Sequence, residues 1–336
     1  MPMRKLTFIL AFLLLAGLQH LHAQINLDTL TALKNNPGIY SLVISKNDKV
    51  IYNSYFNQQG QDSLLNDQSL TKDVISTLIG IAIDKGYIKS VDEKVFDFFP
   101  ELINDTDKRK QDITIRQIMN QASGLYHENL DSLAAFLNLP NPSAYVLKAP
   151  LTARPGKVYH YSNAATHLLS VILTKSTGMD THTFAIKYLF APMSINNFGW
   201  MKMNDGYYDG SGLLSIRLRS TDMLKIGSLF LHKGVYDDMQ VVPAKWINLV
   251  LHPDTTYHTE WGFEQSTYAL CWYHAVYKGT DITYGLGWGG QFLIIIPSLQ
   301  AVVVANENPA DASAIKQEII FMHRIFPVIF DQLNNP

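Results

Sequence analysis

Strand-like segments lie at both ends of this chain and helix-like segments lie between them, and this order constrains the fold more than any other feature. Near the N-terminus, two apolar stretches within residues 40–56 meet at Asn47-Asp48, a pair typical of a two-residue hairpin turn. After residue 260, strand-like stretches return, and a helical pattern at 312–330 closes the chain. These stretches are 266–277, 291–296 and 301–306, with turn residues at Gly279-Thr280-Asp281 and Pro297-Ser298.

Because strands and helices do not alternate regularly, a parallel sheet of βαβ units is not expected. The pattern instead predicts an α+β fold in which the N-terminal and C-terminal strands form one antiparallel sheet. Terminal helices flank this sheet, and a helical insert occupies about residues 90–200.

The longest buried helix is predicted where nearly every residue from Val74 to Ile83 is apolar, with Gly86 as a stop and Asp67 as a candidate N-cap. Further helices are predicted at 164–177 before Gly178, at 184–190 before Pro192 and at 221–232 before Gly234, together with a short helix at 27–34.

Ser69 and Lys72 lie in the first turn of the predicted helix, three residues apart and therefore on adjoining faces. A serine becomes a strong nucleophile when a neighbouring base removes its proton, and a lysine with a lowered pKa can act as that base. By itself this S-x-x-K spacing is common, and its simpler interpretation is a capping serine followed by a solvated charge.

Tyr161 and Asn163 precede the helix predicted at 164–177, where Ser162 or Asn163 is the expected N-cap. On such an irregular segment a phenol can pass a proton and an amide can hydrogen-bond a lysine or a substrate. His160 and His167 lie close by, and we expect them to be structural or to line the substrate site rather than to act in catalysis.

Residues 285–291 are rich in glycine and formally match G-x-G-x-x-G through Gly285, Gly287 and Gly290. A dinucleotide site requires this pattern to open a helix within a βαβ unit, whereas a strand follows here. We therefore reject nucleotide binding and expect these glycines to let a ligand approach the backbone closely.

Composition excludes several classes of function. Of 336 residues, 47% are apolar and 17% are charged, which is an ordinary globular balance. Residues 1–23 have the pattern of a secretory signal with cleavage before Gln24, although an uncleaved anchor is the alternative. Its removal takes Arg4 and Lys5 from 27 basic residues, leaving 25 against 29 acidic ones, so that no nucleic-acid partner is expected.

The mature chain, residues 24–336, is predicted to form a single exported domain, periplasmic or secreted, with no further membrane span. The single cysteine, Cys271, cannot form an intramolecular disulfide and reads as a packing residue, with a Cys271 and His274 catalytic pair as the alternative. The histidines lack the spacing of metal ligands, so neither a metal nor another cofactor is expected.

Three motifs in this order, S-L-T-K at 69–72, Y-S-N at 161–163 and W-G-G at 288–290, resemble the serine β-lactamase and penicillin-binding-protein superfamily. The likeness is to its branch of class C β-lactamases, D-aminopeptidases and β-lactamase-like esterases, and it extends over residues 40–306. It implies that Ser69 is the acylated nucleophile, Lys72 its general base, Tyr161 a second proton-transfer group and Asn163 a supporting residue. The resemblance also implies that Trp288, Gly289 and Gly290 lie on the strand that faces the serine, with the backbone N–H groups of Ser69 and Gln291 as oxyanion donors.

Two departures from the family pattern bear on activity. Asp73 follows Lys72 directly, but adjacent helical residues do not face each other, so we do not expect the carboxylate to hold the lysine charged. Trp288 stands where β-lactam-binding members have a lysine, which argues against strong β-lactamase activity.

Our leading hypothesis is an exported serine hydrolase that forms an acyl-enzyme on Ser69 and acts on small esters, amides or peptides. The alternative is a catalytically silent relative that binds a cell-envelope peptide or serves as a scaffold.

Overall fold

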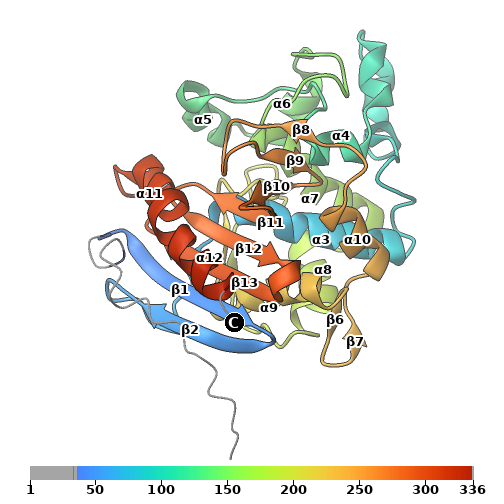
Figure 1. Cartoon of the computed structure of the whole chain (residues 1–336). Helices are drawn as coiled ribbons and strands as arrows, with labels where there is room; N and C mark the ends of the chain where they lie inside the picture. Colours follow the sequence, from blue (N-terminus) through green and yellow to red (C-terminus); the bar gives the residue numbers. More distant parts are fainter. Residues whose placement is uncertain (1–32, 34–35, 335–336) are drawn as a thin grey trace, which may run out of the picture.

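The computed structural model describes residue 33 and residues 36–334, and its main feature is a large antiparallel sheet (Figure 1). Over the described residues this sheet has eight strands, and both ends of the chain contribute to its centre. In spatial order they are β2 (Lys49–Tyr55), β1 (Ile39–Lys46), β13 (Ala301–Glu307), β12 (Gln291–Ile296), β11 (Thr280–Gly287), β10 (Trp272–Tyr277), β9 (Thr267–Ala269) and β8 (Tyr257–His258). The predicted α+β architecture is confirmed.

The hairpin of β1 and β2 turns at Asn47 and Asp48, as the sequence predicts. Both residues have positive φ, 49° and 63°, which asparagine and aspartate tolerate better than most residues. On its other edge β1 pairs with β13, and Val43 lies opposite Val304. The N-terminal hairpin is thereby joined to the C-terminal strands in one sheet.

Alternation along the central strands divides the core into two layers. Leu293, Ile295, Val302 and Val304 face the helices of the insert. Phe292, Ile294, Ile296 and Val303 face the C-terminal helices, which cross the other side of the sheet in Figure 1. Both faces are apolar because both are covered, which explains why β12 reads as one continuous hydrophobic run.

The C-terminal helix is not continuous. It divides into α11 (Ala314–Ile320), a π-helical turn (Phe321–Ile325) and α12 (Phe326–Asn334). Pro327 has no N–H to donate to His323, four residues earlier, and this lost bond accounts for the wider turn.

The helical insert runs from α3 to α10, residues 71–251, and is therefore longer than the predicted 90–200, but its longest helices agree with the predictions. α3 has 14 residues and ends two residues before Gly86, and α7 ends at Gly178, whose φ is 70°. The helices before β8 are α3 (Thr71–Asp84), α4 (Ile115–Met119), α5 (Leu130–Leu137), α6 (Pro142–Lys148), α7 (Asn163–Thr177), α8 (Thr181–Ala185), α9 (Ser220–Leu231) and α10 (Ala244–Leu251). A π-helical turn, Ile186–Phe190, continues α8. Short 3-10 turns lie at Gln68–Leu70, Val95–Asp97, Pro100–Asn104, Lys108–Asp112 and Pro297–Leu299.

Short strands accompany the insert. β3 (Leu65–Asn66), β5 (Ile216–Leu218) and β4 (Gly199–Trp200) form a small sheet beside the start of α3. β6 (Val235–Tyr236) and β7 (Met239–Gln240) form a separate hairpin.

The strand β11, the helix α10 and the short strands β3 to β8 were not anticipated, and one predicted strand was divided. β11 contains glycines and an aspartate, so its sequence resembles a turn, and α10 is short and follows a proline. The predicted strand 266–277 is split into β9 and β10 by Leu270 and Cys271, whose φ values are 51° and 72°. There the backbone N–H of Cys271 donates to the carbonyl oxygen of Met119, so a tertiary contact overrides the local strand pattern.

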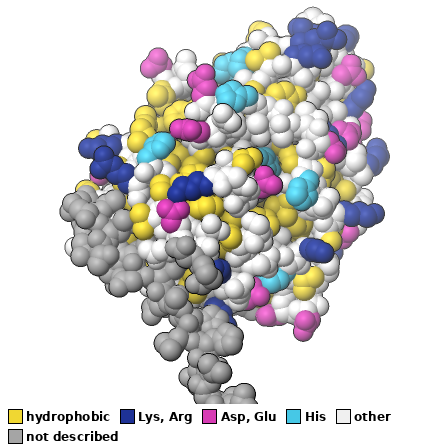
Figure 2. Space-filling view, in the orientation of Figure 1, with side chains coloured by type: hydrophobic (Ala, Val, Ile, Leu, Met, Phe, Trp, Pro, Cys, Tyr) yellow, Lys and Arg dark blue, Asp and Glu magenta, His cyan; other side chains and the backbone are white. Residues whose placement is uncertain are grey.

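The proposed signal segment and the helix predicted at 27–34 lie outside the described residues, apart from Leu33. No helix in the described part of the chain combines the length and apolar character needed to cross a membrane. On the face drawn in Figure 2, acidic and basic side chains are interspersed. The assignment of residues 24–336 to a single domain stays a prediction.

The packing of β12 against the C-terminal helices generates a stability prediction. Ile294 is fully buried in that layer, so Ile294→Ala should lower the free energy of unfolding by about 2 to 5 kcal/mol. The matched control is Val276→Ala in β10, because Val276 is 66% exposed and its loss should cost about 0.5 kcal/mol or less. Chemical denaturation of both variants measures the difference, and equal costs would contradict this account of the core.

Candidate active site

Ser69 lies on a strained turn at the start of α3. This turn, which we call the nucleophile turn, is the 3-10 segment Gln68–Leu70, in which Gln68 has a φ of 50°. Two acceptors hold this conformation, since the N–H of Gln68 donates to Asn66 Oδ1 at 3.1 Å and to Ser215 Oγ at 2.7 Å. The N-terminus of a buried helix therefore begins directly behind the serine, as predicted from the apolar run.

The prediction that Asp67 caps this helix is wrong, because its side chain makes no capping bond. Its carboxylate accepts instead from the N–H of Leu218 at 2.9 Å and from Asn306 Nδ2 at 3.2 Å. Burial raises the pKa of Asp67 well above its usual value. Asp67 thus ties the nucleophile turn to β5 and β13, a long-range role that local spacing does not reveal.

The structure brings together four of the side chains selected from the sequence. Lys72 Nζ donates to Ser69 Oγ at 3.0 Å, and Tyr161 Oη donates to the same oxygen at 2.9 Å. Lys72 Nζ also donates to Asn163 Oδ1 at 2.6 Å. Ser69 therefore lies between two proton-carrying groups that come from different elements.

Lys72 is almost fully buried, with 1% of its surface exposed, and its third hydrogen bond goes to the carbonyl oxygen of Ser211. An ammonium has three N–H donors, and here each has an acceptor. When the group loses a proton, Asn163 Oδ1 and the Ser211 carbonyl can only continue to accept. The lone pair of the neutral amine must then face Ser69 Oγ, the one neighbour that can donate a proton.

Burial sets the protonation of both groups. It lowers the pKa of Lys72 to about 8, against the opposing effects of the carboxylates of Asp209 and Glu128. Burial also raises the pKa of Tyr161 above its usual value, although the bond to Ser69 acts in the other direction. Lys72 is therefore the easier of the two to deprotonate, and Tyr161 keeps its proton.

Tyr161 and Asn163 are positioned by the start of α7. Ser162 Oγ accepts from the N–H of Ala165 at 2.8 Å, which confirms the predicted cap. The carboxylate of Glu128 accepts from the N–H groups of Asn163 at 2.9 Å and Ala164 at 3.0 Å. The Ser162 hydroxyl and the Glu128 carboxylate thus both accept from backbone N–H groups in the first turn of α7. They fix the helix terminus from which Asn163 reaches Lys72.

Residues 209–218, which we call the cradle segment, wrap around the nucleophile turn. Besides the Ser211 carbonyl on Lys72, the N–H of Ile216 donates to Thr71 Oγ1 at 2.9 Å. A Cβ added to Gly212, whose φ is 90°, would lie 2.3 Å from the carbonyl oxygen of Gln68, so only glycine fits there. This segment was not among the predicted site residues. The only local signal in the segment is the turn-prone run Asp209-Gly-Ser-Gly212.

Comparison with known proteins identifies the family of this chain. The family model described as Beta-lactamase matches residues 27–319, which is most of the chain. The chain belongs to the beta-lactamase family. No protein with a curated description matches the sequence.

Solved structures share the fold of this family member at low sequence identity. One is named as a 6-aminohexanoate-dimer hydrolase from Bacillus anthracis, with a TM-score of 0.75, 19% identity, and coverage of 91% of this chain and 83% of that one. A D-stereospecific amidohydrolase from Streptomyces sp. has a TM-score of 0.66 at 16% identity and covers 88% and 96%. The octameric penicillin-binding protein homologue from Pyrococcus abyssi has a TM-score of 0.67 at 18% identity and covers 87% and 73%.

In this family member the strand that lies against the nucleophile helix is β11. A Cβ on Gly285 would lie 1.9 Å from Asp73 Oδ2, and one on Gly287 would lie 2.7 Å from the carbonyl oxygen of Asp67. These two glycines let the strand approach α3 and its preceding turn. These glycines therefore make room for the protein's own helix and turn, and not for the ligand that was predicted from the sequence.

Trp288, Gly289 and Gly290 form the turn between β11 and β12. The N–H of Gly289 donates to Glu318 Oε1 at 2.8 Å, and the N–H of Gly290 donates to the Gly287 carbonyl at 3.2 Å. Trp288 is 38% exposed on this turn. The W-G-G motif was predicted to lie on the strand that faces the serine, but it lies on the turn that follows β11, and its role in substrate binding stays a prediction.

Gln291, which begins β12, is fully buried. Its Nε2 donates to the carbonyl oxygen of Glu307 at 2.8 Å, and its Oε1 accepts from the Glu307 N–H at 3.1 Å. The side chain therefore fixes β12 against β13, and the assignment of the Gln291 backbone N–H as an oxyanion donor stays a prediction.

The remaining candidates take structural positions. His167 is fully buried, with Nε2 at 3.0 Å from Asp205 Oδ2, and its Nδ1 accepts from the Gly210 N–H at 3.3 Å. The ring of His160 lies 4.6 Å from that of His127. These contacts agree with the structural role expected for both histidines.

Asp73 and Cys271 are buried beside Lys72. Asp73 makes no ion pair with Lys72 among the described residues, as its place on the helix predicts, and burial raises its pKa well above the usual value. Burial likewise raises the pKa of the Cys271 thiol. His274 Nδ1 lies 3.3 Å from Thr283 Oγ1, so no contact in the described structure supports a Cys271 and His274 pair.

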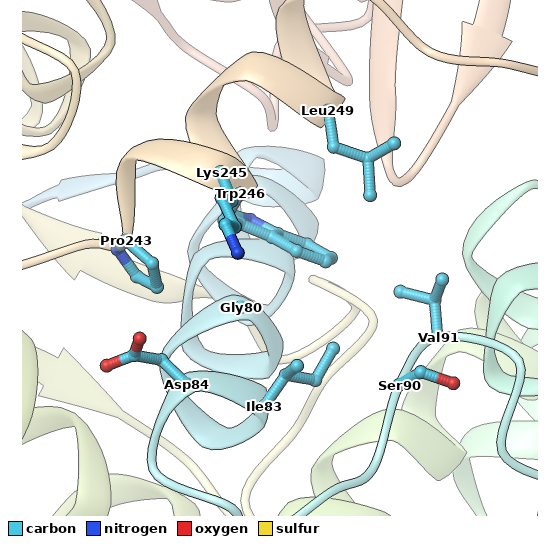
Figure 3. A pocket seen from close by; sticks show the side chains of 9 residues that line it. All are labelled: Gly80, Ile83, Asp84, Ser90, Val91, Pro243, Lys245, Trp246 and Leu249. Atoms are coloured by element: carbon cyan, nitrogen blue, oxygen red, sulfur yellow. The ribbon is translucent and has the colours of Figure 1, made fainter.

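A cavity of about 350 Å³ opens at the C-terminal end of α3, away from Ser69 (Figure 3). The indole of Trp246 lies against Gly80 there, where an added Cβ would meet the ring at 2.2 Å. None of Ser69, Lys72, Tyr161 and Asn163 lines this cavity. Its walls are Gly80, Ile83, Asp84, Ser90, Val91, Pro243, Lys245, Trp246 and Leu249.

The lowered pKa of Lys72 predicts how the reactivity of Ser69 depends on pH. Only the neutral amine accepts a proton, and with a pKa of about 8 roughly a tenth of it is neutral at pH 7. Covalent labelling of Ser69 by a fluorophosphonate should therefore speed up about tenfold per pH unit below this pKa and level off above it. Intact mass against time, measured from pH 5 to 10, gives the profile. A flat profile would show that Lys72 is not the group that titrates.

Proposed function

We propose that this protein is a serine hydrolase that forms an acyl-enzyme on Ser69 and cleaves small esters or amides. The observation that carries the proposal is the position of Ser69 Oγ, 3.0 Å from Lys72 Nζ and 2.9 Å from Tyr161 Oη. A nucleophile within hydrogen-bond reach of a base and an acid has the geometry that acyl transfer requires. The family match and the two fold neighbours named for amide hydrolysis support the same reaction class.

In the first half-reaction, neutral Lys72 removes the proton of Ser69 while Oγ attacks the substrate carbonyl carbon. The negative charge then develops on the carbonyl oxygen, near the N-terminus of α3, where the Ser69 N–H is a candidate donor. Collapse of this intermediate breaks the bond to the leaving alcohol or amine, which takes a proton from Tyr161. Acylation leaves Lys72 as the ammonium and Tyr161 as the phenolate, and transfer of a proton from the first to the second returns both groups to their starting forms.

In the second half-reaction, water attacks the acyl-enzyme and Ser69 leaves with a proton. The same groups serve because the step is the first one in reverse, with water in place of the leaving group. We also propose that the protein is exported. The N-terminal pattern at residues 1–23 is the support for this, and finding Gln24 as the first residue of the mature protein would test it.

Single substitutions around Ser69 test the mechanism. Ser69→Ala should abolish labelling and turnover while the thermal midpoint stays close to wild type, because the half-buried serine makes few packing contacts. Lys72→Ala should slow acylation by about as much, since members of one catalytic unit are not additive. Tyr161→Phe keeps the ring and should lose about 10²- to 10⁴-fold in rate. A folded wild type that neither labels nor turns over any ester or amide would favour the silent scaffold.

Trp288 generates a prediction about substrates. A carboxylate beside it would lack the charge-assisted hydrogen bond of a lysine, worth about 1.5 to 3 kcal/mol. Short-chain p-nitrophenyl esters should therefore be hydrolysed, and cephalosporins weakly or not at all. Trp288→Lys should shift the ratio of kcat/KM values toward substrates that bear a carboxylate. Efficient cephalosporin turnover by the wild type, unchanged in the variant, would show that a different residue binds the carboxylate.

A further inference from the structure

The carboxylate of Asp209 is fully buried and accepts five hydrogen bonds from the cradle segment. Its Oδ1 accepts from the N–H of Ser211 at 2.8 Å and from Ser211 Oγ at 2.5 Å. Its Oδ2 accepts from the N–H groups of Gly212 at 2.9 Å, Leu214 at 2.8 Å and Ser215 at 3.2 Å. One side chain thereby determines the path of the backbone from 209 to 215.

That path brings the cradle segment onto the nucleophile turn at successive points. The Ser211 carbonyl meets Lys72 Nζ, and Gly212 lies against Ser69, where an added Cβ would come within 2.9 Å of Cα. Ser215 Oγ then accepts from the N–H of Gln68 at 2.7 Å. The residues that Asp209 gathers are thus the same ones that contact Gln68, Ser69 and Lys72.

We propose that Asp209 is a positioning residue for Lys72, acting through the Ser211 carbonyl and through the charge of its own buried carboxylate. The inference rests on the proposed function, because it concerns the base that activates Ser69. It gives Asp209 two separable effects. One is the geometry of the cradle segment, and the other is the affinity of Lys72 for its proton.

The sign of the second effect follows from the surroundings of Lys72. Several groups face Lys72 from the elements around it. They are Asp73 on its own helix, Ser69 on the preceding 3-10 turn, Tyr161 and Asn163 at the start of α7, Glu128 before α5, Asp209 and Ser211 in the cradle segment, and Cys271 before β10. Among the charges that act on it, Asp209 has the largest influence and Glu128 the next, and both favour the ammonium. Removing either negative charge should therefore lower the pKa of Lys72 further.

The experiment compares Asp209→Asn with Asp205→Asn and Glu128→Gln in the full chain. Asp205 is a control for the effect of charge, because its side chain is also buried and accepts from His167 Nε2 and from the N–H of Tyr207. It is not a control for geometry, because His167 Nδ1 accepts from the Gly210 N–H and lies 3.8 Å from Asp209 Oδ1. Asp205 is not among the charges that act on Lys72. For each variant, the rate of fluorophosphonate labelling is measured from pH 5 to 10, and the ¹³Cε shift of Lys72 is titrated by NMR, with Lys72→Ala to assign the signal.

We expect Asp209→Asn to lower the labelling rate on the high-pH plateau about tenfold or more. The part of the profile that rises with pH, which we call the acid limb, should move down by about 0.5 to 1 pH unit. The NMR titration should move by the same amount. Glu128→Gln should move both in the same direction, and Asp205→Asn should move neither, even where it lowers the thermal midpoint. If the acid limb of Asp209→Asn lies at the same pH as that of Asp205→Asn, the proposal is overturned.

Two further readouts keep the inference separate from folding and from the proposed function. Ser211→Ala removes one of the five bonds without changing charge, so it should slow labelling with the acid limb in place, whether or not Asp209→Asn folds. Labelling of Ser211→Ala at the wild-type rate would overturn the proposal. If the wild type does not label at all, the proposed function fails, while the NMR titration still decides whether Asp209 controls the proton on Lys72.

Discussion

The site depends on one constraint, which is that the ammonium of Lys72 is removed from water and must find all its hydrogen-bond partners inside the protein. A buried charge without partners would cost several kcal/mol, or would lose its proton. Here three acceptors from three separate segments surround Nζ, and burial still lowers the pKa to about 8. The lysine is thus held close to the balance point between its two forms, which a general base at neutral pH requires.

The fold is arranged to supply those partners. Ser69 lies on the 3-10 turn just before α3 and Lys72 lies in the first turn of α3, and glycines in β11 let the strand approach that helix. The other two acceptors of Lys72 are each positioned by a carboxylate, Asn163 by Glu128 and Ser211 by Asp209. These carboxylates accept hydrogen bonds from backbone N–H groups and thereby organise the chain. Their negative charge also opposes the positive charge of the lysine.

How much of this could be predicted depended on whether the signal was local. The apolar run of α3, the Ser162 cap and the Asn47-Asp48 turn follow from short-range rules. These rules placed Lys72, Tyr161 and Asn163 correctly, whereas Ser69 lies on the 3-10 turn just before α3 and not in its first turn. Asp67 was misassigned because its partners, Leu218 and Asn306, are far away in sequence. β11 was missed because its glycines, which resemble a turn, are required by close packing on α3. Likewise, nothing in the run 209–212 reveals that a carboxylate gathers five donors there.

The two groups on Ser69 Oγ are suited to opposite tasks, and burial produces both. Desolvation disfavours whichever form carries a charge, so the same dry environment lowers the pKa of the cationic acid Lys72 and raises that of the neutral acid Tyr161. The first becomes a base at moderate pH and the second keeps a proton to give away. A more hydrated cleft would leave the lysine charged and the tyrosine easier to ionise, and the two roles would then no longer be distinct. The exclusion of water around Lys72 is therefore part of the chemistry itself, and the buried side chains of Asp73 and Cys271 beside it contribute to that exclusion.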